Sequence, residues 1–213
     1  DKAIFPNVSL ETRLGQNGGL KLRLPIIIGG LGSTNVAGIN WDGLAIGSAI
    51  TGTVLTIGEN VCGMDVESKI ENGRVVHSPE LARRVKLFQD WQEKGYGAVV
   101  VQANVEDPRL KIQEYAIEKL GVDAVELKWG QGAKDIGGEV KIKSLEKAQL
   151  LAKRGYIVLP DPLDPAVVEE FKKGIFTEFE RHSRVGMVDE ESFVARVQEL
   201  RKAGAKFITL KTG

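Results

Sequence analysis

Apolar and polar residues follow two different periods along this chain. From Pro25 onward, short and nearly continuous apolar runs alternate with longer stretches in which apolar residues recur at helical spacing. The short runs are typical of strands buried on both faces, and the longer stretches are typical of amphipathic helices. We therefore predict strands at residues 25–29, 53–58, 98–102, 122–127, 156–159 and 206–211.

Capping residues mark the boundaries of the helical stretches. Ser78 precedes Pro79, a residue suited to the first turn of a helix, while Asp189 and Gly204 stand where a cap and a stop are expected. We interpret the acid-rich stretch 168–180 as a helix with a solvated face. Further helices are predicted at residues 79–95, 108–120, 144–154 and 189–203.

Strands that alternate with helices indicate an α/β fold with a parallel sheet. A doubly wound sheet would favour Gly-x-Gly-x-x-Gly after its first strand, and Gly29-Gly30-Leu31-Gly32 does not have that spacing. A (β/α)8 TIM-type barrel carries functional loops after every strand, and here glycine, lysine, glutamate or glutamine follows most of the predicted strands. We therefore predict the barrel.

The length of the chain predicts that only the N-terminal part of such a barrel is present. Eight strands need about 250 residues, whereas this sequence has 213. We expect the remainder to come from residues outside this sequence; the alternatives are a separate chain and a nonfunctional fragment. Residues 1–24 are interpreted as an approach segment with a cap or hairpin around Asn17-Gly18-Gly19, and residues 25–213 as the barrel portion.

Composition narrows the classes of partner. Basic and acidic residues both number 29, so no nucleic-acid or membrane partner is indicated by charge. Cys62 is the only cysteine, which excludes an intrachain disulfide; we expect it to be a small buried residue. His77 and His182 lack neighbours at metal-ligand spacing, so no metal site is predicted. With no signal-peptide pattern and no long apolar span, we expect a cytoplasmic protein.

One glycine-rich loop carries the strongest chemical signal. The strand at 122–127 leads into residues 128–138, which hold four glycines together with Lys128, Gln131 and Lys134. Glycines let backbone N–H groups approach a ligand closely, and the lysines supply positive charge. The loop therefore predicts an anion site. The alternative is a mobile turn with solvated lysines.

This loop resembles a known one. Lys-x-Gly-Gln-Gly-Ala-Lys followed by Gly-Gly is similar to the loop of the FMN-binding synthase domain of glutamate synthases that holds 2-oxoglutarate beside the flavin. Residues 25–33 resemble the first strand and flavin-facing loop of that family, and residues 57–60 resemble its Gly-Glu turn. Residues 207–211 resemble a later strand that ends in a flavin-contacting lysine. The resemblance spans residues 24–213.

The resemblance implies an FMN-dependent oxidoreductase that converts 2-oxoglutarate to L-glutamate through 2-iminoglutarate. It makes residues 206–211 the fifth barrel strand and 156–165, with its three prolines, an excursion from the barrel. Ammonia would arrive from solution or from a glutaminase subunit, and a further subunit would donate electrons. We expect an oligomer. An iron–sulfur cluster of the kind found in the family would have to come from residues outside this chain.

Particular residues take roles only through this resemblance. Glu59 would be the catalytic acid–base, although a solvated turn residue is an equal alternative. The substrate would be bound by Lys128, Gln131, Lys134 and Arg154, the last of which is alternatively an exposed helix-end arginine. FMN would be contacted by Gly29, Gly30, Gly32, Ser33, Gln102, Asn104 and Lys211, with helix capping as the alternative role of Gln102 and Asn104.

Three other functional interpretations remain open at this point. One is a noncatalytic barrel scaffold or regulatory subunit that binds a dicarboxylate without flavin. Another is an N-methylglutamate-synthase-type component, which would share the same loop. The third is a phosphate-sugar lyase or isomerase. Such an enzyme would not explain why the loop from Lys128 to Lys134 has this particular sequence.

Overall fold

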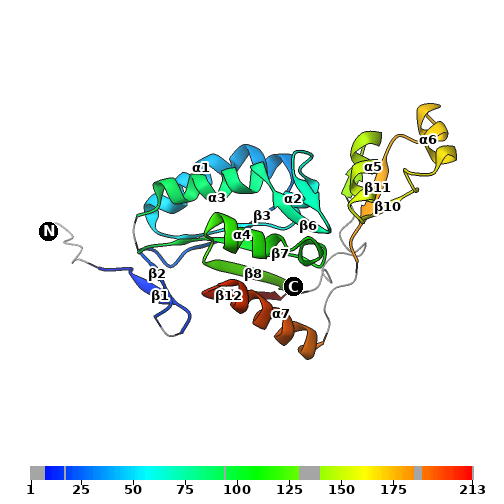
Figure 1. Cartoon of the computed structure of the whole chain (residues 1–213). Helices are drawn as coiled ribbons and strands as arrows, with labels where there is room; N and C mark the ends of the chain where they lie inside the picture. Colours follow the sequence, from blue (N-terminus) through cyan, green and yellow to red (C-terminus); the bar gives the residue numbers. More distant parts are fainter. Residues whose placement is uncertain (1–7, 17, 94, 130–139, 185–188, 213) are drawn as a thin grey trace.

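The computed structural model of the chain describes residues 8–16, 18–93, 95–129, 140–184 and 189–212 (Figure 1). Its centre is a parallel sheet of five strands in the order β12-β8-β7-β4-β3. Among these strands, neighbours in the sheet are also neighbours along the chain. The strands are β3 (Ile27–Leu31), β4 (Val54–Ile57), β7 (Ala98–Ala103), β8 (Ala124–Trp129) and β12 (Phe207–Thr212). The predicted α/β class and these five predicted strands are confirmed.

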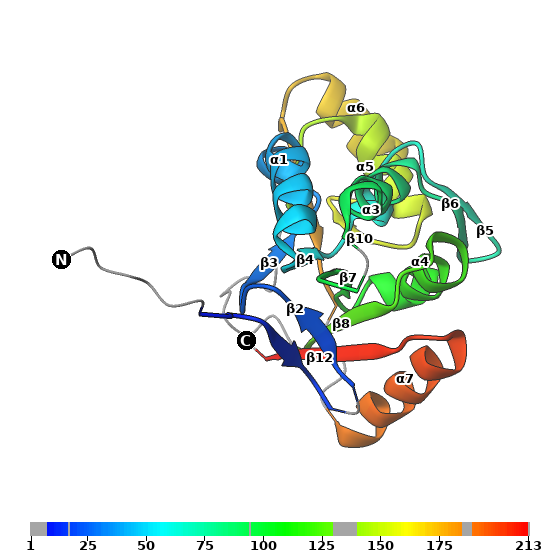
Figure 2. The same cartoon turned by 90° about the vertical axis from the view of Figure 1, so that its left-hand side faces the viewer.

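The main helices pack on one face of the parallel sheet, as Figure 2 shows. Trp41 and Phe88 from the helices are wholly buried in one apolar cluster with Leu55 of β4 and Val99 of β7. A second cluster joins Val125 of β8 to the helix nearest the C-terminus. These helices are α1 (Asn35–Thr51), α3 (Pro79–Trp91), α4 (Ile112–Leu120) and α7 (Glu190–Ala203).

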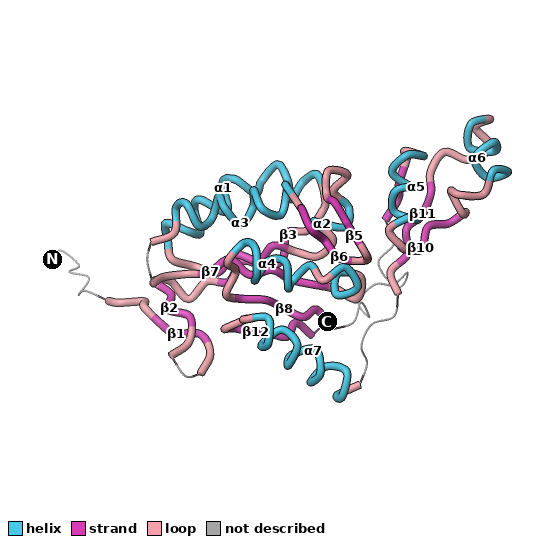
Figure 3. The backbone as a smooth tube through the Cα atoms, viewed as in Figure 1, coloured by secondary structure: helices cyan, strands magenta, loops and turns pink. Residues whose placement is uncertain are grey.

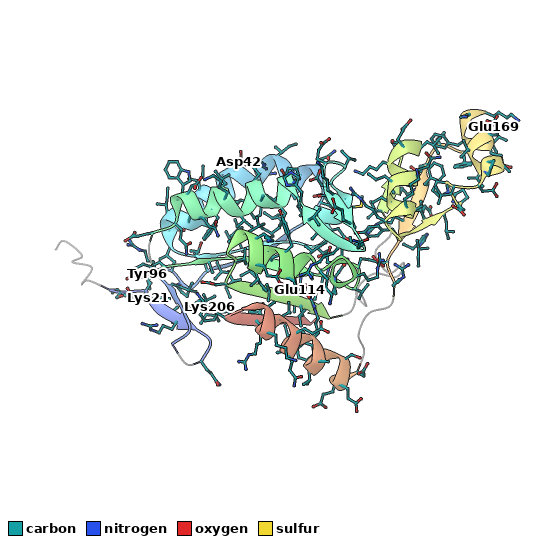
Figure 4. The ribbon with its side chains drawn as sticks, viewed as in Figure 1. Lys21, Asp42, Tyr96, Glu114, Glu169 and Lys206 are labelled. Carbon is teal, nitrogen blue, oxygen red and sulfur yellow. The ribbon has the colours of Figure 1, made fainter. Side chains whose placement is uncertain are left out.

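An N-terminal hairpin covers the amino-terminal end of the opposite, concave face. Its strands β1 (Thr12–Leu14) and β2 (Leu20–Leu22) are antiparallel, and Leu22 packs against Val54 and Val100 of the sheet. Lys21 donates a hydrogen bond of 2.7 Å to the Tyr96 hydroxyl, and the two side chains lie together in Figure 4. The hairpin predicted within residues 1–24 is therefore confirmed.

A second, smaller sheet lies beyond the carboxyl ends of the parallel strands, as Figure 3 shows. It is antiparallel, in the order β10-β11-β9, so the predicted excursion from the parallel sheet is confirmed. Phe171, Phe176 and Phe179 form its aromatic core with ring centroids 4.9–5.4 Å apart. The elements are β9 (Val140–Ile142), α5 (Leu145–Lys153), β10 (Ile157–Leu159), α6 (Pro165–Lys172) and β11 (Phe179–His182).

The helix predicted at 168–180 is wrong in its extent. Helix α6 ends at Lys172, Gly174 adopts a left-handed φ of +74°, and residues from Phe179 onward form β11. Glycine tolerates the left-handed conformation without a steric cost, so it ends the helix here. Residues 179–182 then alternate between buried and half-buried positions, which is the period of a strand.

Several elements have no counterpart in the sequence predictions. The longest is α1, which contains Gly38, Gly43 and Gly47, and each internal glycine weakens the helical signal by about 1 kcal/mol relative to alanine. The predicted helix at 108–120 is divided into a 3-10 turn, η1 (Asp107–Leu110), and α4. The remaining unpredicted elements are α2 (Val61–Met64), the hairpin strands β5 (Lys69–Glu71) and β6 (Arg74–His77), and β9 of the small sheet.

The loops after β3 and β4 touch through their glycines, which gives a first prediction. A Cβ added to Gly58 would lie 2.6 Å from the Gly32 backbone nitrogen, so one loop would have to shift. We expect Gly58→Ala to lower the free energy of unfolding by about 1–3 kcal/mol, as measured by urea denaturation. Gly43→Ala is the control, because Gly43 is exposed in α1 with no atom within 4 Å of its Cβ position. It should raise the same free energy by about 0.5–1 kcal/mol. Equal stability of the two variants would contradict the tight contact between the loops.

Candidate functional site

A cavity of about 320 Å³ opens at the carboxyl ends of the parallel strands. Its volume lies at the lower end of the range of about 300–1,000 Å³ that ligand pockets span. All five parallel strands or the loops that follow them contribute to its lining, and β9 and β11 of the small sheet contribute as well. Carboxyl ends of parallel strands are where α/β proteins place their ligands.

Seven of the residues that the sequence singled out line this cavity together. They come from segments far apart in the chain, and the folding of the parallel sheet in strand order brings them to one edge. Gln131 and Lys134 lie outside the described residues. The seven are Gly30, Gly32, Ser33, Glu59, Gln102, Lys128 and Lys211.

An ion pair joins two of these residues across the cavity wall. Lys128 Nζ lies 2.7 Å from Glu59 Oε1, and the two side chains are only 17% and 19% exposed. Lys211 of β12 is the register partner of Lys128 in the neighbouring strand. An ammonium and a carboxylate at this distance can bind a polar substrate together, and the carboxylate can exchange a proton with it.

A row of polar side chains lies one step deeper on the concave face. Gln102, Glu126 and Thr209 are register partners in β7, β8 and β12. The amide of Gln102 donates to Glu126 Oε1, and the Thr209 hydroxyl donates 3.1 Å to Glu126 Oε2. Glu126 was not singled out from the sequence, where its signal is one charged residue inside an apolar strand. This row fixes the position of the Gln102 amide.

Two of the predicted flavin-contacting glycines are needed for packing between loops. A Cβ on Gly30 would lie 2.9 Å from Gln102 Oε1, and a Cβ on Gly32 would lie 2.8 Å from the Glu59 carbonyl oxygen. Both glycines line the cavity, so they combine close backbone packing with access to a ligand. Gly29 is not among the lining residues, and no atom lies within 4 Å of its Cβ position.

Two predicted residues have other partners and do not line the cavity. Asn104 Oδ1 accepts hydrogen bonds from the backbone N–H groups of Glu106 and Asp107, at 2.8 and 3.3 Å, so it caps η1, which is its alternative role. The Arg154 guanidinium donates to the carbonyls of Gly63, Asp65 and Ser68 at 2.6–2.8 Å. Arg154 is therefore half-buried and ties α5 to α2 and to the segment between α2 and β5, in contrast to both the substrate role and the exposed position considered from the sequence.

Arg181 and Asn60 are cavity residues that the sequence did not indicate. The Arg181 side chain is 1% exposed, donates from Nη1 to Asn60 Oδ1 at 3.1 Å and lies 5.3 Å from the centre of the Tyr156 ring. Asn60 adopts a left-handed φ of +67° directly after Glu59. The only local signal for Arg181 is the alternation along β11, because its place depends on how the small sheet packs.

A buried carboxyl group lies directly behind the loop that carries Glu59. Asp107 is 1% exposed, and its Oδ2 accepts the backbone N–H groups of Asn60 and Asn104, both at 3.2 Å. Burial raises the pKa of Asp107 to about 7, and the negative charge of Glu59 acts in the same direction. The two N–H groups and Arg181 oppose this rise.

The cysteine, possible metal sites and possible membrane spans can also be examined among the described residues. Cys62 is 1% exposed, as expected, and its burial raises the pKa of the thiol. In the described ranges, no three His, Cys, Asp or Glu side chains cluster closely enough to hold a metal ion. The same ranges contain no helix with the length and apolar character to cross a membrane.

Comparisons of the chain with protein-family models, with curated proteins and with solved structures found no match. The site therefore has to be interpreted from its own geometry and from the sequence motifs that it brings together.

The raised pKa of Asp107 predicts how stability changes with pH. The carboxyl group titrates near 3.8 when unfolded and near 7 when folded, so between these values the folded protein binds more protons than the unfolded chain. This group therefore lowers the free energy of unfolding as pH rises from about 4 to about 7. We expect Asp107→Asn, which keeps an acceptor for both N–H groups, to remove that decline in urea denaturation at pH 5, 6, 7 and 8.

The control for this prediction is Asp90→Asn, which removes an exposed carboxylate of α3. It should leave the pH dependence of the wild-type protein unchanged. Parallel pH curves for wild type and Asp107→Asn would show that Asp107 does not titrate in this window.

Proposed function

We propose that the protein is an FMN-dependent oxidoreductase of the glutamate-synthase type, which forms L-glutamate from 2-oxoglutarate and ammonia. The observation that carries this proposal is the gathering of seven motif residues around one cavity. Loops that follow the strands of a parallel sheet meet at one edge in any such sheet, so the support lies in the types of residue that gather there. Two lysines, a carboxylate and an amide lie beside glycines at the cavity.

The arrangement of helices and strands supports a barrel over a doubly wound sheet. A doubly wound sheet carries helices on both faces and reverses its strand order, whereas the strands here run in chain order with the main helices on one face. We infer that the sheet is five strands of a (β/α)8 barrel. Three further strands, from residues outside this sequence, would pair with β3 and β12, where Ile27 is 56% and Leu210 is 39% exposed.

The described residues fit the ring end of a flavin. The Gln102 amide, the Ser33 hydroxyl and the Lys211 ammonium supply donors and acceptors suited to the polar edge of an isoalloxazine ring, and all three line the cavity. Positive charge from Lys211 would stabilise an anionic reduced ring. Barrels of this type usually bind the phosphate after their last two strands, which would belong to the inferred remainder. When bound, FMN would supply the hydride that reduces 2-iminoglutarate.

The ion pair of Lys128 and Glu59 suits the amination step. Ammonia and the keto carbon of 2-oxoglutarate condense with loss of water, and this step requires protons to leave nitrogen and to reach oxygen. The Lys128 ammonium would hold a substrate oxygen, and the Glu59 carboxylate would take and return the protons. The proposed substrate contacts of Gln131 and Lys134, and the glutaminase and electron-donor subunits, stay predictions.

Flavin binding and glutamate formation test this function. We expect the purified protein to bind FMN, with absorption bands that dithionite bleaches and 2-oxoglutarate perturbs. Glu59→Gln should keep the flavin bands but lower glutamate formation by about a hundredfold or more, because the proton carrier is lost. The measurement is mass-spectrometric detection of glutamate from dithionite-reduced protein, 2-oxoglutarate and ammonia.

The matched control is Glu67→Gln, which removes an exposed carboxylate near the start of the β5–β6 hairpin. It should leave both flavin binding and glutamate formation unchanged. The described residues are proposed to hold the flavin ring, so a protein that retains neither FMN nor riboflavin after free flavin is removed would contradict the proposal and favour a scaffold that binds a dicarboxylate. Wild-type activity of Glu59→Gln would remove Glu59 from the proton step.

A further inference from the structure

The buried guanidinium of Arg181 has fewer partners than its burial requires. Its side chain is 1% exposed, and its Nε atom has no hydrogen-bond partner among the described residues. Within the same residues, Arg181 forms no salt bridge, although Arg184 and Arg196 each pair with a carboxylate. Burial of a positive charge is costly unless an anion or several hydrogen bonds compensate it. The charge of Asp107 acts on Arg181, but among the described residues no carboxylate contacts the guanidinium directly, so its unpaired Nε needs an explanation.

Neighbouring side chains hold this guanidinium at the cavity wall. The Tyr156 ring lies 5.3 Å from it, and Asn60 Oδ1 accepts its Nη1 hydrogen at 3.1 Å. Asn60 is fixed in turn by its backbone N–H, which donates to the buried Asp107. Both Arg181 and Asn60 line the cavity. An arginine that is held on one side and unpaired at Nε is suited to grip a carboxylate with its remaining N–H groups.

The charges of the cavity indicate what kind of ligand it takes. Among the described residues that line the cavity, Lys128, Arg181 and Lys211 are positive and Glu59 is negative, an excess of two positive charges. The lysines come from the parallel sheet, whereas Arg181 comes from β11 of the small sheet. A small molecule with two carboxylates would match both the excess charge and the two separate sources of positive charge.

We propose that Arg181 binds one carboxylate of a dicarboxylate substrate, while Lys128 and Lys211 attract the other. The identity of that dicarboxylate as 2-oxoglutarate rests on the proposed function; the role of Arg181 rests on its own burial and missing partner. Arg154 is not available for this task, because its guanidinium already donates to three backbone carbonyls. Arg181 would thus select dicarboxylates over monocarboxylates.

Calorimetric titration with 2-oxoglutarate and with the monocarboxylate 2-oxobutanoate tests this role. The wild-type protein should bind 2-oxoglutarate at least tenfold more tightly. Arg181→Lys and Arg181→Gln should weaken 2-oxoglutarate binding by about tenfold to a hundredfold, as expected for the loss of a charged hydrogen bond. The same variants should leave 2-oxobutanoate binding nearly unchanged, so that the discrimination between the two ligands collapses.

Arg196→Lys is the matched control, because Arg196 is also buried but pairs with Glu114 between α4 and α7, away from the cavity. It should lower stability without changing either affinity. Unchanged 2-oxoglutarate affinity in Arg181→Gln, or no binding of 2-oxoglutarate by the wild-type protein, would overturn the proposal. If the Arg181 variants unfold, a crystal structure of the wild-type protein with 2-oxoglutarate decides: a carboxylate oxygen within hydrogen-bond distance of Arg181 supports it, and any other position overturns it.

Two further measurements distinguish carboxylate binding by Arg181 from the proposed oxidoreductase function and from phosphate binding by Arg181. A protein that binds 2-oxoglutarate through Arg181 but never binds FMN would support the inference and contradict the oxidoreductase. FMN and riboflavin titrations address the phosphate as an alternative anion. If Arg181→Lys weakens FMN but not riboflavin, and leaves 2-oxoglutarate affinity intact, Arg181 serves the phosphate and the proposal fails.

Discussion

The assembled site depends on the ion pairs that the buried carboxylate of Glu106 forms with two arginines. Its side chain is fully buried, and it accepts hydrogen bonds from Arg109 next to the parallel sheet and from Arg184 just beyond β11. A buried carboxylate is costly without paired cations, and Glu106 shares two arginines that come from different parts of the fold, so the two arginines and the carboxylate constrain each other. The small sheet is therefore held over the carboxyl ends of the parallel strands, and this placement brings Arg181 to the cavity wall.

The loop after β4 connects this docking to the proposed chemistry. Glu59 and Asn60 are adjacent, yet they face different partners: Glu59 pairs with Lys128 of the parallel sheet, and Asn60 accepts from Arg181 of the small sheet. The left-handed backbone of Asn60 turns the chain between these two directions. Asp107 fixes the turn from behind by accepting the Asn60 N–H. A change in the position of the small sheet would therefore move Asn60 and, through it, the adjacent Glu59 and its ion pair with Lys128.

Local patterns in the sequence predicted most of the parallel sheet, because buried strands need short apolar runs whatever they pack against. The seven cavity residues were singled out through the family resemblance, and they meet because strand ends in a parallel sheet share one edge. Helix α1 was not predicted, because its three internal glycines weaken the helical pattern in the sequence. In the folded protein, the packing of Trp41 in the core compensates for the low helix propensity of these glycines. The place of Arg181 in the cavity was not predicted, because its partner Asn60 lies 121 residues earlier in the chain. Arg154 was assigned to the substrate because spacing alone cannot tell whether backbone carbonyls already occupy a guanidinium.

Strand register explains how one face of a sheet can be apolar at one end and charged at the other. On the concave face, Val100 and Ala124 are register partners that pack under Leu22, Gln102 and Glu126 form the next level, and Lys128 and Lys211 form the level at the cavity. Each level is two residues further along its strand, because side chains alternate between faces. A slip of β8 by one residue would turn Leu127 toward the cavity and Lys128 toward the helices. The apolar contacts of Val125 and Leu127 with α7 oppose such a slip, so the packing of the helix-covered face also fixes the charges of the site.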